Sequence, residues 1–492
     1  MFTKQNFLRS FFSPCLFAIV TGLITLVSVS KLSADEMNLF QEDFAYFTNT
    51  LKEAHPNIYD GMPDFDSETE KVMQELAKVS DISEFKLLLT RFTHKLKDGH
   101  SGLSIFENLG DSSYPISLWW HETGWYLDLT DADHKGYLGA KVLSINGYDT
   151  DEVMQALIEL SPGENIYYHR KLASFLLRHP TYLELLGFGS EDGALHLSLD
   201  QDGKTASIEL LNKESHNLWN TQKTGITKNQ YINYWGQALP EDKLFYLQFN
   251  SFSDHDGSDS YAHWKAFLGG VFSEIEEHQI DRLVIDLREN GGGNSMLGNI
   301  LLGFCSLPDT LKNFSAEVKF GELFLENYDM DITTLREKIT DELGDEPADE
   351  FPLIINYAAD SGKISSKHYH DLIDNDLELK QIPKYQGDII ILIGSQTFSS
   401  AVMFATICKD NDLATLIGSP TGGKPSCYGD ILSFRLPNTQ SPCIVSHKYF
   451  RRPNSEFDSD DSLYPDINFV PTPQQQFSEH DALWEELILD NK

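Results

Sequence analysis

Apolar side chains recur at helical spacing near the start of the chain. Four residues of Met37–Glu53 fall three or four positions apart and would line one helix face; they are Phe40, Phe44, Phe47 and Leu51. The same spacing recurs in two further stretches, Val72–Ala77 and Phe85–Leu96. We therefore predict an N-terminal helical domain over residues 35–110.

From residue 111 to residue 213 the apolar runs shorten to strand length. The predicted strands are Ile116–Trp119, Trp125–Leu129, Lys141–Ile145 and Ser207–Leu211. Asn146-Gly147 marks a turn before the helix-like stretch Asp151–Leu160. The pattern predicts a small β-domain, either of the PDZ-like, peptide-binding kind or of another kind with similar strands. Residues 214–240 are polar and weakly patterned, which indicates a connection.

From residue 241 to residue 492, strands alternate with helices. The predicted strands are Phe245–Phe249, Leu283–Leu287, Ile389–Ile393 and Thr415–Ile417, and the predicted helices are Leu297–Cys305 and Ser400–Asp410. This alternation predicts a parallel sheet. A long, charged and irregular insertion, residues 307–387, interrupts the series. It is either a lid over a site or surface decoration.

Composition narrows the class of protein. The chain has 492 residues, 41% hydrophobic and 12% aromatic, which is enough to build the cores of two or three domains. Its formal net charge is −37 at pH 7. Because binding to a phosphate backbone requires clustered Lys and Arg, this charge argues against a nucleic acid partner.

The N-terminus has the order of a secretory signal peptide. Lys4 and Arg9 precede a nearly uncharged run over residues 11–30, and the small Ala34 offers a cleavage point. We predict that residues 1–34 are removed, that the mature chain is periplasmic or secreted, and that it keeps no stable membrane insertion. The alternative is an uncleaved anchor, because the run approaches the ~18 residues that can span a bilayer.

Cysteine usage leaves the redox state open. Four cysteines follow the predicted signal peptide: Cys305, Cys408, Cys427 and Cys443. An exported chain permits disulfides, and three pairings are possible; free, buried thiols are the alternative. The spacing of these residues does not fit a zinc site, and we expect neither a metal nor a cofactor.

The strongest chemical signal is a serine between a strand and a helix. The strand Ile389–Ile393 is followed by Gly394-Ser-Gln-Thr-Phe-Ser399-Ser-Ala401 and then by the predicted helix. The unpaired N–H groups of the first helical turn are suited to bind the oxyanion of an acyl-transfer intermediate. The alternative is that Ser399 only caps the helix, a common role for serine.

Two glycine-rich turns accompany this serine. Gly291–Gly293 directly follows the strand Leu283–Leu287 and lets the backbone approach a ligand closely; the spacing of a dinucleotide fingerprint is absent. Gly418–Lys424 has the spacing of a phosphate loop, but Pro425 stands where such a loop carries Ser or Thr. Lys424 is instead a candidate general base if burial lowers its pKa, or simply a solvated lysine.

Together these segments resemble the C-terminal processing (tail-specific) serine peptidases. The matching motifs occur in the family's order: Asp98-Gly-His-Ser101, Ile285-Asp-Leu-Arg288 with Gly291–Gly293, Thr397-Phe-Ser-Ser-Ala401, and Gly418–Lys424. The resemblance implies an α/β fold, with a crotonase-like ββα peptidase core, an N-terminal helical domain and a small PDZ-like β-domain. It also implies hydrolysis of a peptide or unfolded protein substrate through an acyl-enzyme.

The resemblance assigns roles to individual residues. Ser399 rather than Ser400 is the nucleophile, because Phe404 and Lys424 follow Ser399 at the family's offsets of five and 25 residues. The oxyanion would then be bound by the backbone N–H groups of Gly292 and Ser400.

The family has two versions of the general base. In the Ser–Lys branch a lysine placed like Lys424 takes the proton, and in the branch resembling the tricorn core a histidine placed like His100 does so, assisted by a carboxylate. Tyr428 stands where Ser–Lys enzymes often have glutamine, and His55–Tyr59 resembles the histidine branch. We therefore favour His100 and keep Lys424 as a participant or a substrate contact. The assisting carboxylate is left open among Asp430, Asp458, Asp460 and Asp461.

The sequence thus predicts an exported serine endopeptidase. The alternative is a non-catalytic ligand- or peptide-binding protein on the same scaffold, because a fold does not fix a function. The joint presence of Ser399, His100, Lys424 and Gly291–Gly293 favours the enzyme. A phosphate-loop nucleotide hydrolase is rejected because of Pro425 and the exported setting.

Overall fold

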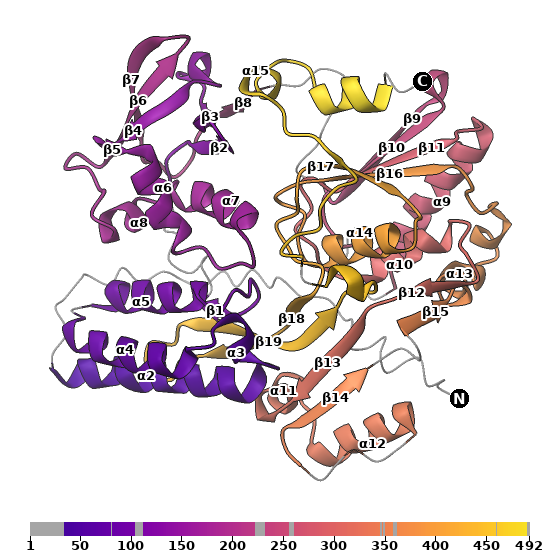
Figure 1. The fold of residues 1–492 in the computed structure, drawn as a ribbon, viewed down its shortest axis with the longest axis horizontal. Coiled ribbons are helices and arrows are strands. Elements are labelled where there is room, and N and C mark those ends of the chain that lie inside the picture. The colour runs from indigo at the N-terminus through magenta and orange to yellow at the C-terminus, as the bar shows by residue number, and fades with distance from the viewer. Residues whose placement is uncertain are drawn as a thin grey trace.

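Helical, β-sheet and α/β units follow one another along the chain in the computed structural model (Figure 1). The structure describes residues 34–79, 81–103, 112–221, 232–254, 260–344, 347, 350–357, 362–458 and 460–489. The predicted signal peptide, residues 1–34, lies outside these ranges apart from Ala34. Within the ranges, a search for a membrane-spanning helix finds none with the necessary length and hydropathy.

The N-terminal unit is helical, as the apolar spacing predicts. Its helices are α2 (Ala34–Ala54), α3 (Ile58–Gly61), α4 (Phe65–Glu75) and α5 (Ile82–His94). The side chain of Asp81 caps α5 by accepting from the N–H groups of Ser83 and Glu84. Phe44, Phe47 and Leu51 are fully buried, which confirms the predicted face of the first helix.

A β-domain follows, with an antiparallel sheet in the order β2-β3-β4-β6-β7. Its strands are β2 (Ser117–His121), β3 (Gly124–Asp131), β4 (Lys141–Ile145), β5 (Tyr148–Asp149), β6 (Ala194–Gln201), β7 (Lys204–Leu211) and β8 (Leu218–Asn220). Its helices are α6 (Thr150–Ile158), α7 (Ile166–Leu176) and α8 (Pro180–Leu185). Leu197, Leu199 and Val153 belong to one core shared by the sheet and α6.

The α/β unit contains the predicted parallel sheet. The strand order is β20-β17-β16-β11-β10-β9, and only the pairing of β9 with β10 is antiparallel. The strands are β9 (Tyr234–Leu239), β10 (Leu244–Phe249), β11 (Arg282–Asp286), β16 (Asp388–Ile393), β17 (Thr415–Gly418) and β20 (Ile467–Asn468). Every residue of β10 is buried. A strand inside a parallel sheet is covered on both faces, which explains why its sequence is a nearly continuous apolar run.

The two faces of this sheet are covered differently. Helices α9 (Ala262–Glu277), α10 (Met296–Gly303) and α14 (Ser400–Asp410) pack on the face that carries Leu283 and Ile285. The opposite face, which carries Val284, packs against Trp484 and Ile488 near the C-terminus. Burial on alternate faces follows the two-residue period of β11.

The insertion predicted to be irregular is in fact folded, so that part of the prediction is wrong. It contains β12 (Thr310–Lys312), β13 (Ser315–Phe320), α11 (Glu322–Asn327), α12 (Ile332–Leu343), β14 (Leu353–Tyr357), β15 (Lys363–Ser365) and α13 (Lys367–Asp374). β13 pairs with β14 and with β19 (Pro442–Arg451). Through Val318 and Phe320 the insertion shares a core with the N-terminal helices. Because its apolar residues pack against a partner distant in sequence, their spacing within the insertion does not show a regular pattern.

A second sheet joins segments that are far apart in the sequence. β18 (Cys427–Arg435) and β19 form an antiparallel hairpin, and the short β1 (Gly102–Leu103) pairs with β19. The four cysteines of the described chain, left open by the sequence, are free and buried. The predicted fold class, a mixed α/β chain with a helical N-terminal region and several sheets, is confirmed.

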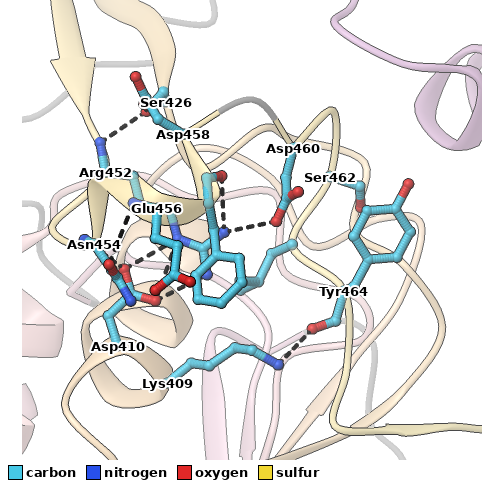
Figure 2. Close-up of polar contacts among 12 residues, drawn as sticks. Lys409, Asp410, Ser426, Arg452, Asn454, Glu456, Asp458, Asp460, Ser462 and Tyr464 are labelled. Carbon is cyan, nitrogen blue, oxygen red and sulfur yellow. Dashed lines mark hydrogen bonds and ion pairs between the residues drawn. The ribbon is translucent and has the colours of Figure 1, made fainter.

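A buried ion pair connects the end of α14 to the end of β19. The Arg452 guanidinium donates to both carboxylate oxygens of Asp410 at 2.8–3.2 Å, and its other nitrogen donates to Asp460 at 3.0 Å (Figure 2). The side chains of Arg452 and Asp410 are only 1% and 2% exposed. The backbone N–H of Asn454 donates to the same carboxylate. The buried Asp410 carboxylate therefore keeps its hydrogen-bond donors only while α14 and the segment after β19 stay packed together.

We predict that Arg452→Met lowers the free energy of unfolding by about 3–5 kcal/mol, because it leaves Asp410 buried without its cation. Urea unfolding followed by circular dichroism measures the change. Arg451→Met is the matched control, because Arg451 is exposed and its guanidinium lies over the face of the Tyr449 ring. For this variant we expect a loss below about 1 kcal/mol. Equal losses in the two variants would contradict the assignment.

Candidate active site

Ser399 occupies a strained turn between β16 and α14. Its backbone has φ 53° and ψ −127°, a conformation that costs free energy in a residue with a side chain and recurs at functional sites. Ser399 stands at the N-cap position, but its hydroxyl makes no capping hydrogen bond. The structure therefore does not support the alternative in which Ser399 only caps the helix.

His100 faces this hydroxyl. Its Nε2 lies 3.2 Å from Ser399 Oγ, although 299 residues separate the two in the sequence. The imidazole stacks on the ring of Phe398 at a centroid distance of 5.0 Å, and Tyr168 stacks against Phe398 at 4.5 Å. Pairing of β1 with β19 fixes the backbone just after His100, so the ring is held from two directions.

A buried carboxylate organises the turn that carries His100. Asp98 Oδ1 accepts from the His100 backbone N–H at 2.8 Å, and Asp98 Oδ2 accepts from Ser446 Oγ at 2.8 Å. The N–H of Asn57 donates to His55 Nδ1, which places the ring proton of His55 on Nε2, 3.4 Å from Asp98 Oδ2. Burial opposes ionisation of Asp98, but the contacts with His55 prevail and lower its pKa to about 2.

The environment keeps His100 neutral. Burial lowers the pKa of His100 from its ordinary 6.5, and the negative charges of Asp98 and Asp430 only partly oppose this shift. A neutral imidazole with its Nε2 beside a hydroxyl has the protonation state that a general base requires.

A second buried carboxylate, Glu164, lies against the other ring nitrogen. Glu164 Oε1 is 3.9 Å from His100 Nδ1, and the Glu164 side chain is 3% exposed. Burial and then the charge of Asp98 raise the pKa of Glu164 to about 8, against the opposing effect of the Lys424 N–H. No motif in the sequence indicates Glu164, because this residue lies in the β-domain, between α6 and α7.

The glycine turn contacts the nucleophile directly. A Cβ added to Gly292 would lie 2.7 Å from Ser399 Cβ and 3.0 Å from the Ser400 nitrogen. However, the Gly292 N–H donates to Asn290 Oδ1 at 2.8 Å. Gly292 therefore lies close to Ser399, as predicted, but its N–H is engaged by Asn290, so its role as an oxyanion donor stays a prediction.

Ser400 is held in a role distinct from that of Ser399. Its hydroxyl donates to the Gly293 carbonyl at 2.6 Å, so this oxygen is committed to the backbone. Its N–H belongs to the first turn of α14, where backbone donors have no intrahelical acceptor. The Ser399 hydroxyl thus faces His100, whereas the Ser400 hydroxyl is bound to the backbone.

Lys424 is near the site through its backbone. Its N–H donates to Glu164 Oε2 at 3.0 Å, and the preceding Gly423 lies against Phe398 and the Ser399 nitrogen. Within the described ranges, no hydrogen bond or ion pair is recorded for the Lys424 ammonium. The structure therefore brings His100, and not Lys424, into contact with Ser399 Oγ.

The four carboxylates considered from the sequence have other partners. Ser426 donates to Asp458, Arg452 binds Asp460, and Tyr464 donates to Asp461; Figure 2 shows the first two contacts. Asp430 pairs with Lys448 and acts on His100 only through its charge. The carboxylates closest to the His100 ring are instead Asp98, at 3.8 Å, and Glu164.

Asp98, His100 and Glu164 also have the spacing of a possible metal site. One ligand atom from each lies within 4.8 Å of the others. This trio has the donors for a small divalent cation, whereas the sequence predicts neither metal nor cofactor.

Comparisons with known proteins agree with the sequence resemblance. Residues 344–468, which contain Ser399 and Lys424, match the model of Peptidase family S41. The fold is similar to mature CPAF complexed with lactacystin (15% identity, TM-score 0.65, 92% of this chain and 97% of that chain) and to mature CPAF alone (16%, 0.64, 92% and 96%). The photosystem II D1 C-terminal processing protease also matches, with 15% identity, a TM-score of 0.42 and coverage of 91% and 98%. No curated protein matches the chain. The match to the S41 family model thus confirms the resemblance, and the two CPAF structures show the same fold.

We predict that Gly292→Ala lowers kcat/KM on a protein substrate by at least about 100-fold, because the new Cβ displaces Ser399 and strains a backbone at φ +99°. Steady-state hydrolysis of fluorescently labelled casein measures the loss. Gly291→Ala is the matched control, since a Cβ at Gly291 meets nothing within 4 Å, and we expect less than about a twofold change. An active Gly292→Ala variant would show that this contact is not required.

Proposed function

We propose that this chain, a serine peptidase of family S41, is an exported endopeptidase that cleaves polypeptides through an acyl-enzyme on Ser399. The observation that carries the proposal is the 3.2 Å contact between His100 Nε2 and Ser399 Oγ. A hydroxyl next to a neutral imidazole loses its proton as it attacks a carbonyl carbon, which is the first step of serine catalysis.

The remaining steps use the same groups. His100 returns the proton to the leaving amine, the acyl group stays on Ser399 Oγ, and a water activated by His100 then releases it. The Ser400 N–H stabilises the oxyanion. Gly292 supplies a second N–H after Asn290 Oδ1 releases it, and substrate binding provides the competing acceptor.

The location of the proposed activity follows from the N-terminus. Residues 1–34 have the order of a signal peptide, so the mature enzyme would meet its substrates in the periplasm or outside the cell. Peptides or unfolded proteins are the proposed substrates. A non-catalytic binding protein on this scaffold is the competing function, and the following experiment separates the two.

We expect the mature chain, starting at Asp35, to hydrolyse casein, and Ser399→Ala and His100→Ala each to reduce kcat by about 10⁴-fold or more. Lys424→Ala should reduce kcat by about tenfold at most, because its ammonium does not contact Ser399 Oγ. Ser400→Ala is a matched control that removes a hydroxyl one residue away and should retain at least about a tenth of the rate.

Two further measurements complete this test. A fluorophosphonate probe should label the wild-type chain and not Ser399→Ala, whatever the substrate preference. EDTA should leave the rate unchanged if the trio Asp98, His100 and Glu164 works without a metal; loss of activity restored by Zn²⁺ would mean that a metal is required. A chain that neither cleaves casein nor reacts with the probe has the binding function.

A further inference from the structure

We infer that Glu164 is the residue that positions His100 for catalysis, and that the β-domain thereby supplies a part of the peptidase site. The inference rests on the proposed function. It goes beyond that function by naming the carboxylate that the sequence left open and by making the site incomplete without the domain that carries Glu164.

Two buried polar atoms face each other without a partner. His100 Nδ1 and Glu164 Oε1 are both buried and neither makes a hydrogen bond within the described chain, although they are only 3.9 Å apart. Such orphaned atoms are costly unless they become paired. A movement of about 1 Å brings them to hydrogen-bonding distance, and contacts of this kind often tighten when substrate binds.

Asp98 is the competing partner, and its oxygens are already occupied. Oδ1 accepts from the His100 backbone N–H and Oδ2 accepts from Ser446 Oγ, with His55 Nε2 close by. Asp98 therefore fixes the turn that carries His100, whereas Glu164 Oε1 is unengaged. Asp98 thus fixes the backbone of His100, and Glu164 orients its imidazole ring.

The loop that carries Glu164 is fixed to the peptidase core. Glu164 Oε2 accepts from the Lys424 N–H at 3.0 Å. The amide of the adjacent Asn165 donates to the carbonyls of Thr421 and Asp461 at 3.1 and 2.9 Å. His94 of α5 contacts the Ser161 carbonyl at 2.7 Å, so the loop is also tied to the N-terminal helices.

The protonation state of Glu164 decides which tautomer of His100 is favoured. Nε2 can take the Ser399 proton only if Nδ1 carries the single ring proton of the neutral imidazole. An ionised Glu164 accepts that Nδ1–H and stabilises the active tautomer. A protonated Glu164 can donate to Nδ1 instead, which places the ring proton on Nε2 and removes the acceptor for Ser399.

Glu164→Gln tests the inference, because the amide keeps the shape of the side chain and cannot ionise. We expect kcat on labelled casein to fall by about 10²–10⁴-fold with little change in KM, because the lost contact acts on the base and not on substrate binding. Glu159→Gln removes an exposed charge at the end of α6 and should keep both kcat and KM. Circular dichroism and thermal unfolding of both variants verify that they are folded.

The outcomes separate this inference from the proposed function. If the wild type cleaves casein in a Ser399-dependent manner while Glu164→Gln keeps its kcat, the peptidase function stands and the role of Glu164 is wrong. If Glu164→Gln loses kcat only together with its thermal stability, Glu164 has only a structural role. If the wild type neither cleaves nor reacts with the fluorophosphonate probe, the proposed function itself fails.

Discussion

The close packing of three chain segments around Phe398 and Ser399 is the constraint on which the site depends. An added Cβ would lie 2.6 Å from the Phe398 ring at Gly99, 2.7 Å from Ser399 Cβ at Gly292, and 3.3 Å from the Ser399 nitrogen at Gly423. Only the absence of these side chains lets the three backbones meet at one strained turn. His100, the Gly291–Gly293 turn and Lys424 are therefore each positioned by a glycine in or next to them.

Buried charge is the second constraint. Asp98 stays ionised because donors from three separate segments, at His55, His100 and Ser446, converge on it. Arg452 and Asp410 solve the same problem at the far end of α14 by forming a bidentate pair. Glu164 lacks such compensation on one oxygen, and burial, followed by the charge of Asp98, raises its pKa.

The sequence predicted the elements whose signals are local. The parallel strands, the helix Ser400–Asp410 and the N-terminal helices are present where apolar spacing placed them. Its motifs also indicated Ser399, His100 and the Gly291–Gly293 turn, which the fold brings together.

Features that depend on long-range pairing were missed. The strands β13 and β14 of the insertion are half-exposed along much of their length, and β13 pairs with β19, more than 100 residues away. They therefore lack a clear pattern of their own. The role of Asp98 was hidden because its partners lie in three segments. Glu164 was hidden because a lone glutamate in a loop has no pattern, and only burial distinguishes it from the exposed Glu159.

Assembly of the site from several units has an energetic consequence. Glu164 has an ordinary pKa of 4.5 when solvated and about 8 when its loop is docked. Because the docked pKa is raised, the docked state is favoured most below pH 4.5 and is progressively disfavoured as the pH rises to about 8. The ionisation that would activate His100 therefore also weakens the attachment of the loop that carries Glu164. The hydrogen bonds of Asn165 to the core do not depend on this charge, and they hold the loop in place where the ionised carboxylate is needed.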